Sequence, residues 1–195
     1  LIVDFENRVR TYADRMLEGM LHRANELTQA LRETAERDGL TGVYNREHLS
    51  RVFSREFEKA KKKGTPLSIV MIDLDDFGQF NKTRGFVTGD KVLVTAAATI
   101  NSAVRANDWT ARYGGEEFIV VMPDTRELEA RMVATRIIEA LRTAPFEAFD
   151  GTAVRVTGTA GVAELRADDN GTEDLVNRAS GKVIQGKHRG KDRVE

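Results

Sequence analysis

The chain has 195 residues, which is enough for one domain of ordinary size with a short attachment. Its 30 basic and 31 acidic side chains nearly cancel, so it lacks the positive excess of a general nucleic-acid binder, and we expect no nucleic-acid partner. It contains no cysteine, which excludes disulfides and thiolate metal sites, and its three histidines are too scattered to form a metal cluster.

No apolar stretch approaches the roughly 20 residues that a membrane-spanning helix requires, and no signal peptide opens the chain. We therefore expect a cytoplasmic location without membrane contact. Because the first residue is Leu1 rather than Met, we also expect a piece of a longer protein.

Residues 1–37 predict one long helix, because apolar residues recur there at steps of three and four along a narrow stripe. The stripe consists of Phe5, Val9, Tyr12, Met16, Met20, Ala24, Leu27 and Leu31. A narrow stripe with charged flanks favours pairing with a second chain in a coiled coil. Packing of this helix against its own domain is the alternative. Turn residues at 38–42 then mark the start of a second domain, residues 38–195.

Beyond the turn, apolar spacing predicts helices and strands in alternation. We expect helices over 46–62, 90–104, 125–142 and 172–185, and strands over 67–72, 109–113, 118–122 and 154–162, with an edge strand at Val194. Gly114 and Gly115 are expected to join two strands in a tight turn with positive φ angles. In the helix over 125–142, which Thr125 can cap, the residues expected to face inward are Leu128, Met132, Ile137 and Leu141. This order predicts an α/β or α+β fold, with a mixed sheet covered by helices.

Two groups of carboxylates lie next to predicted strands. Asp73, Asp75 and Asp76 follow an almost continuously apolar strand, and Glu116-Glu117 follow the glycine turn. Carboxylates at a strand end that face a glycine turn can hold Mg²⁺, which proteins bind through one or two carboxylates together with substrate phosphates. Solvated surface charge is the alternative for either group alone.

Two common cation and phosphate motifs are excluded by their spacing. An EF-hand loop beginning at Asp73 would need acidic or amide ligands where Phe77 and Arg84 stand. A P-loop needs a glycine, four further residues and then Gly-Lys-Ser/Thr. The segment 85–90 (Gly-Phe-Val-Thr-Gly-Asp) breaks that pattern. Neither motif therefore accounts for these carboxylates.

The segment Arg112–Phe118 (Arg-Tyr-Gly-Gly-Glu-Glu-Phe) resembles the signature of the GGDEF family, the diguanylate cyclases. Four further motifs agree with that family in order and spacing, so a chance match is implausible. They are the opening segment Asp38–Arg46, the metal-binding strand end Asp73-Leu74-Asp75 with Phe77, the guanine-binding stretch with Asn81, Gly85, Gly89 and Asp90, and Arg105–Asp108 in the place of an RxxD inhibitory motif.

The resemblance implies a palm-like fold with a five-stranded mixed sheet flanked by helices, similar to nucleotide cyclase catalytic domains and preceded here by the N-terminal helix. It implies a reaction in which two GTP give cyclic di-GMP and two pyrophosphates, with Mg²⁺ or Mn²⁺. One domain is expected to hold one GTP, so two must face each other in a homodimer. The N-terminal helix would then set how the two sites meet, and an upstream sensor domain would lie outside this chain.

The family's site residues carry over to the matching positions of this sequence. Metal ligands are expected at Asp73, the Leu74 carbonyl, Glu116 and Glu117, with Glu116 also acting as base at the attacking 3′-hydroxyl. Substrate contacts are expected from Asn81 and Asp90 at the guanine edge, Gly114 and Gly115 beside the substrate, and Lys187 and Lys191 at the phosphates.

A product-binding inhibitory site is implied at Arg105, Asp108 and Arg136. Arginine can read guanine with two parallel hydrogen bonds, and aspartate can accept from its Watson–Crick edge. An ordinary surface ion pair between Arg105 and Asp108 is the alternative.

Several positions depart from the family's pattern. Gly78 stands where a phosphate-contacting lysine is usual, Lys82 replaces an aspartate and Phe86 replaces a histidine. Near the C-terminus, Lys191 replaces an arginine, and Asp192 brings a negative charge towards the expected phosphates. A solvated tail is the alternative for the basic residues there.

These departures concern substrate handling, whereas each expected metal and base position carries a suitable residue. We therefore expect an active cyclase whose KM is raised. One alternative is a catalytically weak domain that binds GTP or cyclic di-GMP as a regulatory module. Another is a cyclase that uses ATP, against which Asp90 argues.

Overall fold

The computed structural model describes residues 15–17, 19–24 and 35–195. The chain divides into two units, Leu1–Glu36 and Arg37–Glu195. In the first unit the described residues 15–17 and 19–24 are helical and exposed, as predicted for this stretch, and Met16 and Met20 of the apolar stripe are among them. The other stripe residues except Ala24 lie outside the described residues.

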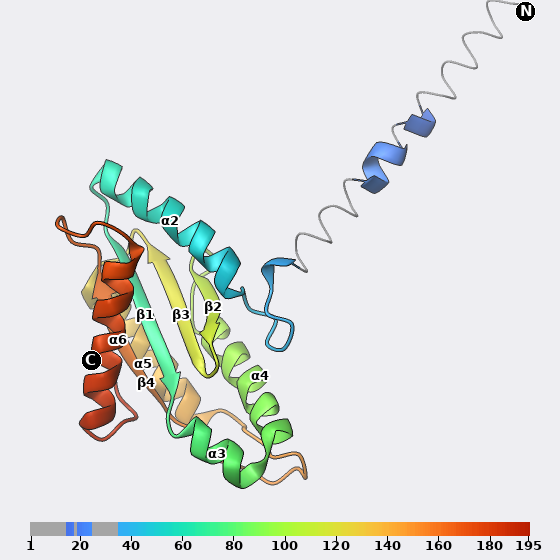
Figure 1. Cartoon of the computed structure of the whole chain (residues 1–195), viewed down its shortest axis with the longest axis vertical. Helices are drawn as coiled ribbons and strands as arrows, with labels where there is room; N and C mark the ends of the chain where they lie inside the picture. Colours follow the sequence, from blue (N-terminus) through green and yellow to red (C-terminus); the bar gives the residue numbers. More distant parts are fainter. Residues whose placement is uncertain (1–14, 18, 25–34) are drawn as a thin grey trace, which may run out of the picture. The chain divides into compact units, whose positions relative to one another are not determined.

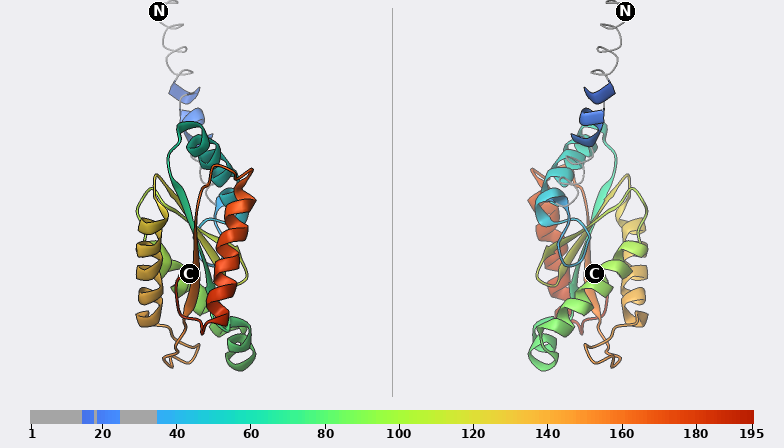
Figure 2. Two further views of the ribbon diagram at one scale, coloured as in Figure 1. Left: turned by 90° about the vertical axis from the view of Figure 1, so that its left-hand side faces the viewer. Right: turned by 90° about the vertical axis from the view of Figure 1, so that its right-hand side faces the viewer.

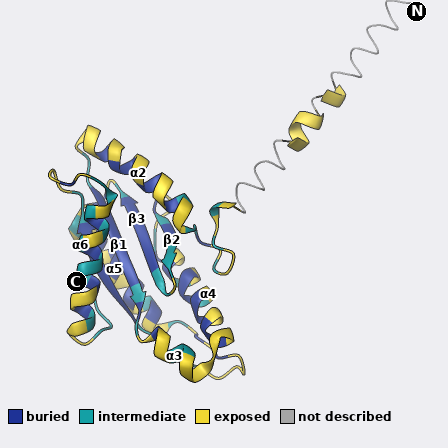
Figure 3. Cartoon of the chain, in the orientation of Figure 1, coloured by how far each residue is buried: buried dark blue, intermediate teal, exposed yellow. Residues whose placement is uncertain are grey.

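The second unit is built on a four-stranded sheet in the order β2-β3-β1-β4, and its neighbouring strands all run antiparallel (Figure 1). The strands are β1 (Leu67–Leu74), β2 (Trp109–Gly114), β3 (Glu117–Pro123) and β4 (Gly158–Glu164). β1 is buried along almost its whole length, because it lies inside the sheet and both of its faces are covered (Figure 3). This confirms the prediction of a doubly covered strand.

Helices cover the two faces of the sheet in separate layers (Figure 2). α2 (Arg46–Lys63) and α6 (Thr172–His188) pack on the face that carries Ile69 and Met71. α4 (Phe86–Ser102) and α5 (Glu127–Thr143) pack on the opposite face, which carries Val70 and Ile72. α3 (Phe77–Arg84) leads from the end of β1 into α4. The α+β class predicted from the sequence is confirmed.

The predicted fifth strand and mixed sheet are wrong for this structure. Val194 forms only an isolated parallel bridge with Ala160, through the backbone of its neighbours Arg193 and Glu195. Contact at a single bridge is too short for a strand, so the parallel pairing stays outside the four-stranded sheet. β4 also begins at Gly158, four residues later than predicted.

The inward face of α5 differs from the predicted one, because Leu128 and Met132 are 73% and 68% exposed. Ile137 and Leu141 are buried as predicted, but the stripe continues from them through Val133, with Ala130, Ala134 and Ile138 beside it. Leu128 and Met132 lie on the exposed side of the helix, whereas Ala130, Val133 and Ala134 form the first part of the buried face.

Local turn chemistry also differs from the sequence-based expectation. α5 begins at Glu127, where the side chain of Glu129 accepts a hydrogen bond from the Arg126 N–H at 3.1 Å, whereas the Thr125 hydroxyl donates to the Pro123 carbonyl. Gly114 and Gly115 are absent from the glycines with positive φ, and the strands meet instead through an irregularity in the β2–β3 register. α3 was not predicted, because it buries only Phe77 and so has no apolar stripe.

No helix within the described part of the chain has the length and apolar character needed to cross a membrane.

A buried ion pair fastens the segment after β4 to α6. The Asp169 side chain is 3% exposed and receives both terminal nitrogens of Arg178. It also accepts the Arg166 N–H at 2.7 Å. The hydrogen bond from Arg178 outweighs the effect of burial and lowers the pKa of Asp169 below its ordinary value.

Asp169→Asn should therefore lower the free energy of unfolding by about 2 kcal/mol at neutral pH, because Arg178 loses its charged partner. The lowered pKa means that this stabilisation is present above 3.8, the ordinary pKa of Asp, and is lost as the pH falls below it. Urea denaturation at pH 7 and pH 3 measures both effects. The exposed neighbour Asp168 provides the control Asp168→Asn, which should change little; an Asp169→Asn deficit that persists unchanged at pH 3 would contradict the assignment.

Candidate active site

The strand register brings the predicted carboxylates to one end of the sheet. Asp73, near the end of β1, lies opposite Glu117, the first residue of β3. The Leu74 N–H also donates to the carbonyl of Glu116 at 3.3 Å. Residues directly opposite each other in antiparallel strands project to the same face, so the side chains of Asp73 and Glu117 both lie on the face that α2 and α6 cover. The register thus places Asp73 beside Glu117 and next to the backbone of Glu116, while a common metal site for these carboxylates stays a prediction.

Asp73 occupies an electrostatically unusual place in this cluster. Burial raises its pKa, and the negative charges of Glu116 and Glu117 raise it further. Lys187, in the last turn of α6, opposes these effects, with its ammonium nitrogen 2.6 Å from the Asp73 Oδ1 atom. The side chain of Asp73 is only 14% exposed, so the ion pair lies largely out of water.

The donor atoms at this end of the sheet suit a hard divalent cation. Three carboxylates and the Leu74 carbonyl are oxygen ligands, which Mg²⁺ and Mn²⁺ prefer. In the part of the chain that the structure describes, however, no three acidic or histidine side chains are already arranged around one point to hold a metal. The predicted ligands therefore lie at the end of β1, at the start of β3 and in the turn before β3, and Asp73 is paired with Lys187.

Arg112 connects the glycine hairpin to the beginning of the domain. Its guanidinium donates to the Gly115 carbonyl from Nε at 3.0 Å and from Nη2 at 2.8 Å, and its Nη1 lies 3.2 Å from Asp38 Oδ1. Although burial acts in the opposite direction, hydrogen bonds from Thr41 and the charge of Arg112 lower the pKa of Asp38. From the sequence, Arg112 was recognised only as part of the signature motif. Its contacts with Gly115 and Asp38 could not be predicted, because Asp38 is far from it in the chain and only the folded structure brings the two together.

The predicted guanine subsite is formed by α3 and α4. The Oδ1 atom of Asn81 is buried and has no hydrogen-bond partner among the described residues. It lies against Gly89, where an added Cβ would approach it to 2.0 Å. Asp90, the next residue of α4, is exposed. A buried acceptor without a donor is costly unless a ligand supplies one, and a purine N–H is a suitable donor.

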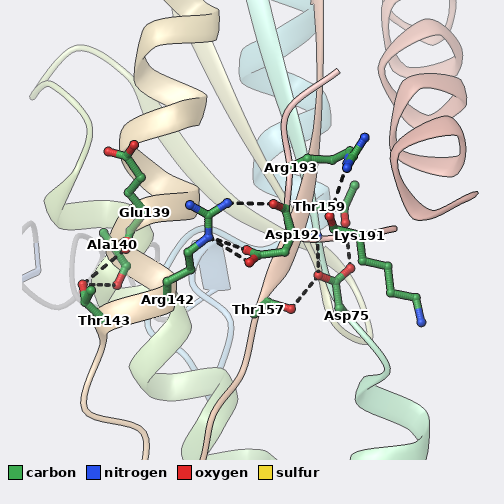
Figure 4. A network of polar contacts seen from close by, with 10 residues as sticks. All are labelled: Asp75, Glu139, Ala140, Arg142, Thr143, Thr157, Thr159, Lys191, Asp192 and Arg193. Carbon is green, nitrogen blue, oxygen red and sulfur yellow. Dashed lines mark hydrogen bonds and ion pairs between the residues drawn. The ribbon is translucent and has the colours of Figure 1, made fainter. Parts of the chain in front are cut away.

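A network of polar contacts holds the C-terminal turn, residues 189–193, against the end of β1 (Figure 4). Asp75 accepts hydrogen bonds from the hydroxyls of Thr157 and Thr159, each at 2.7 Å, and from the backbone N–H of Asp192 at 3.0 Å. Arg142, on α5, clamps Asp192 through both carboxylate oxygens at 2.8 Å. Asp75 thus has a structural position, and the charge that Asp192 adds is compensated by Arg142.

Lys191 lies in the same turn but makes a different contact. Its ammonium pairs with Asp76 at 2.6 Å, and both residues line a hollow of 470 Å³ between the start of α3 and the C-terminal turn. The pairing raises the pKa of Lys191. Lys191 is therefore paired with Asp76 beside the turn that follows β1, although both side chains remain exposed to solvent.

Two of the three predicted inhibitory residues, Arg105 and Asp108, lie together on a turn before β2. The side chain of Asp108 accepts the backbone N–H of Arg105 at 3.0 Å, which closes the turn. Both residues line a hollow of 580 Å³ that also includes Glu56 and Lys59 of α2. Arg136, on α5, donates from Nε to the carbonyl of Ala103 at 3.0 Å, so it supports the backbone leading into the turn and does not line the hollow.

A comparison with protein families matches residues 35–193 to the family described as diguanylate cyclase, GGDEF domain. This chain belongs to the GGDEF family. Among its relatives, the response regulator PleD from Caulobacter vibrioides is 37% identical over 171 residues, which are 87% of this chain and 37% of PleD. Because the chain spans so little of that relative, the family membership concerns this domain.

Two solved GGDEF structures resemble the fold closely. The coiled coil and GGDEF domain of DgcB from Caulobacter crescentus, in complex with c-di-GMP, matches with a TM-score of 0.84 and 25% identity, over 90% of this chain and 93% of that one. The active GGEEF domain of a diguanylate cyclase from Vibrio cholerae matches with a TM-score of 0.71 and 31% identity, over 77% of this chain and 94% of that one.

The contact between Gly89 and Asn81 generates a sharp test of the guanine subsite. In Gly89→Ala, the new methyl group would displace the Asn81 amide, because its Oδ1 lies 2.0 Å from the added Cβ. An asparagine side chain can rotate away, so we expect the fold to survive and the affinity for a non-cleavable GTP analogue to fall at least about tenfold. Calorimetric titration measures this affinity.

A matched control is Gly181→Ala, within α6, where an added Cβ meets nothing within 4 Å. It should leave the affinity unchanged and stabilise the helix by about 1 kcal/mol. Equal affinities for the Gly89→Ala variant and the unsubstituted chain would argue against guanine recognition by Asn81.

Proposed function

We propose that this chain is a diguanylate cyclase, which joins two GTP into cyclic di-GMP and releases two pyrophosphates. The observation that carries the proposal is the convergence of Asp73, Glu116 and Glu117 at one end of the sheet, beside Lys187. The similarity to an active GGEEF domain supports it, because the third motif position is also a glutamate here.

The chemistry requires a hydroxyl to become a nucleophile next to a highly charged triphosphate. The 3′-hydroxyl oxygen of one GTP attacks the α-phosphorus of the other, a new P–O bond forms, and the α–β phosphoanhydride bond breaks to release pyrophosphate. In our proposal the carboxylate of Glu116 accepts the hydroxyl proton. Positioning and charge compensation supply most of the catalysis in such a transfer.

A divalent cation is part of the proposal, and the donor set fits it. Asp73, Glu116, Glu117 and the Leu74 carbonyl would hold Mg²⁺ or Mn²⁺, which when bound neutralises phosphate charge and makes the hydroxyl more acidic. Lys187 and Lys191 would contribute positive charge to the terminal phosphates. Gly114 and Gly115, which lack side chains, would leave room for the substrate beside the hairpin.

Base selection would come from Asn81 and Asp90. A carboxylate accepts from the N1–H and the exocyclic amine of guanine, and the unpartnered Oδ1 of Asn81 accepts a further N–H. Adenine has a lone pair at N1 where guanine has N1–H, and it has no 2-amino group, so an ATP substrate would leave the carboxylate without its matching donors. This argues against an ATP cyclase.

Two chains are needed in this proposal, because each domain carries one set of these residues. The helix of residues 1–37 would pair as a coiled coil and set how the two sites meet, under the control of a sensor domain outside this chain. The structure of DgcB, which contains a coiled coil with its GGDEF domain, supports this arrangement. A cytoplasmic location, where GTP is available, belongs to the same proposal.

A catalytically weak regulatory module is the second candidate. It is favoured by Gly78, since no lysine is available at that position, and by Phe86, which is 77% exposed at the start of α4. Such a domain would bind GTP or cyclic di-GMP without turnover.

One experiment separates these functions. The purified chain is incubated with Mg²⁺ and equal amounts of GTP and ATP over a range of protein concentrations, and the products are identified by chromatography and mass. We expect cyclic di-GMP and pyrophosphate from GTP alone, with a specific activity that rises with protein concentration as dimers form. Glu116→Gln should lower kcat at least about a hundredfold, as loss of a general base does, whereas the distant Asp168→Asn should not.

Other products would decide against the proposal in different ways. Nucleotide binding without any dinucleotide at high protein concentration would establish the regulatory module, and a cyclic product from ATP would refute the assigned base selection.

Product inhibition through Arg105 and Asp108 is a further part of the proposal. The turn is closed by the backbone N–H of Arg105, which any residue at that position retains. Arg105→Ala therefore removes the guanidinium and its aliphatic stem but keeps the backbone N–H that closes the turn. The inhibition constant for cyclic di-GMP should rise at least about tenfold while kcat stays unchanged. The exposed Arg166 supplies the control Arg166→Ala. An unchanged inhibition constant in Arg105→Ala would rule this site out.

A further inference from the structure

The ion pair between Lys187 and Asp73 joins two different layers of the molecule. Lys187 belongs to the last turn of α6, and Asp73 lies near the end of β1. Their charged atoms are 2.6 Å apart, and the side chains are 32% and 14% exposed. The pair therefore places an ammonium on one of the carboxylates that a metal would need.

Close packing of α6 fixes where Lys187 stands. At Gly161 of β4, an added Cβ would lie 2.0 Å from the backbone carbonyl of Ala179 in α6. At Gly186, the residue before Lys187, an added Cβ would lie 2.6 Å from a methyl of Thr159 in β4. Because α6 and β4 approach each other so closely at both points, the end of α6 cannot move away from the sheet without losing this packing. The lysine side chain, by contrast, can rotate.

The charges around Asp73 explain why the lysine occupies this position. Asp73, Glu116 and Glu117 carry three formal negative charges, and Lys187 carries one positive charge, which leaves a formal charge of −2. Without any cation, three carboxylates would repel each other in a partly buried site. With Lys187 on Asp73, a divalent cation arriving alone would meet a positive charge already seated on its ligand. Like charges so close repel strongly where water is largely excluded.

We propose that Lys187 exchanges partners on substrate binding, holding Asp73 in the nucleotide-free protein and passing to the triphosphate when metal and GTP arrive together. Two ion pairs are exchanged and no covalent bond changes. The negative charge of the triphosphate then balances the positive charge of Lys187, and the Asp73 carboxylate becomes free to bind the metal. Lys187 thereby disfavours metal binding before nucleotide binding and couples the two events.

This inference rests on the proposed function, since it assumes that the phosphates lie within reach of Lys187. It also accounts for a structural finding, because the described residues hold no preassembled metal cluster although suitable carboxylates lie side by side. A lysine with a purely structural role would predict the opposite effect of its removal, namely a disturbed site with weaker metal binding.

The test is Mn²⁺ binding to the full chain without nucleotide, measured by electron paramagnetic resonance of the free ion. Lys187→Met keeps the length and apolar stem of the side chain and removes the charge, and we expect it to bind Mn²⁺ at least about tenfold more tightly than the unsubstituted chain. Lys187→Arg keeps the charge and should bind as weakly as the unsubstituted chain. The matched control is Arg189→Gln, which removes one positive charge two residues further on, from a side chain that pairs with Glu195 at 3.0 Å; it should change the affinity less than about twofold.

A second titration uses a GTP analogue that cannot be cleaved between the α- and β-phosphates. In the unsubstituted chain, Mn²⁺ should tighten binding of the analogue strongly, and in Lys187→Met this coupling should fall at least about tenfold. The coupling is measured by calorimetry in the unsubstituted chain and in Lys187→Met, and thermal melting curves establish that each is folded.

Mn²⁺ binding that is unchanged or weaker in Lys187→Met would overturn the inference, as would an equal gain in Arg189→Gln. If Lys187→Met does not fold, Lys187→Gln replaces it in the same titrations. Failure of the proposed function is recognised separately, because a chain that makes no cyclic di-GMP from GTP still reports its Mn²⁺ affinity in this experiment.

Discussion

The antiparallel register between β1 and β3 is the constraint on which the site depends. It sets Asp73 opposite Glu117 and brings the backbone of Leu74 within hydrogen-bonding distance of Glu116. A shift of one residue would turn Asp73 towards the face covered by α4 and α5, which is apolar, and would bury a carboxylate without a partner. The apolar residues of β1 and β3 therefore fix the position of the acidic residues that follow or precede them.

The same end of the sheet shows how this chain accommodates residues that differ from the usual family pattern. Asp192 adds a negative charge next to Lys191, a proposed phosphate contact, but Arg142 of α5 binds both of its carboxylate oxygens. Lys191 is likewise oriented by Asp76. Because α5 and the C-terminal turn come from different parts of the chain, such compensation appears only when the layers are assembled. A departure at one position therefore says little about function until its neighbours in space are known.

Sequence patterns predicted the parts of the fold that depend on local spacing, and failed where tertiary contacts decide. The doubly buried β1 and the order of the long helices follow from apolar runs and helical periods. The predicted inward face of α5 was wrong in its first half, because Leu128 and Met132 also follow a helical spacing but lie on the exposed side, whereas Ala130, Val133 and Ala134 are buried. Val194 was predicted to lie in an edge strand, but it forms only an isolated bridge with Ala160. For the candidate site, the acidic residues were found from motifs, whereas the contacts of Arg112 and the pairing of Lys187 with Asp73 required coordinates.

In the turn before β2, the contact that closes the turn does not involve the side chain that is proposed to bind the product. Its closure uses the carboxylate of Asp108 and a backbone N–H, so the side chain at position 105 contributes nothing to that closure. Feedback sensitivity, if carried by that side chain, is then a property that evolution can remove or restore with one substitution and without passing through an unfolded intermediate. Within a lineage of such domains, regulated and unregulated descendants would share the same backbone and differ in their response to accumulated product.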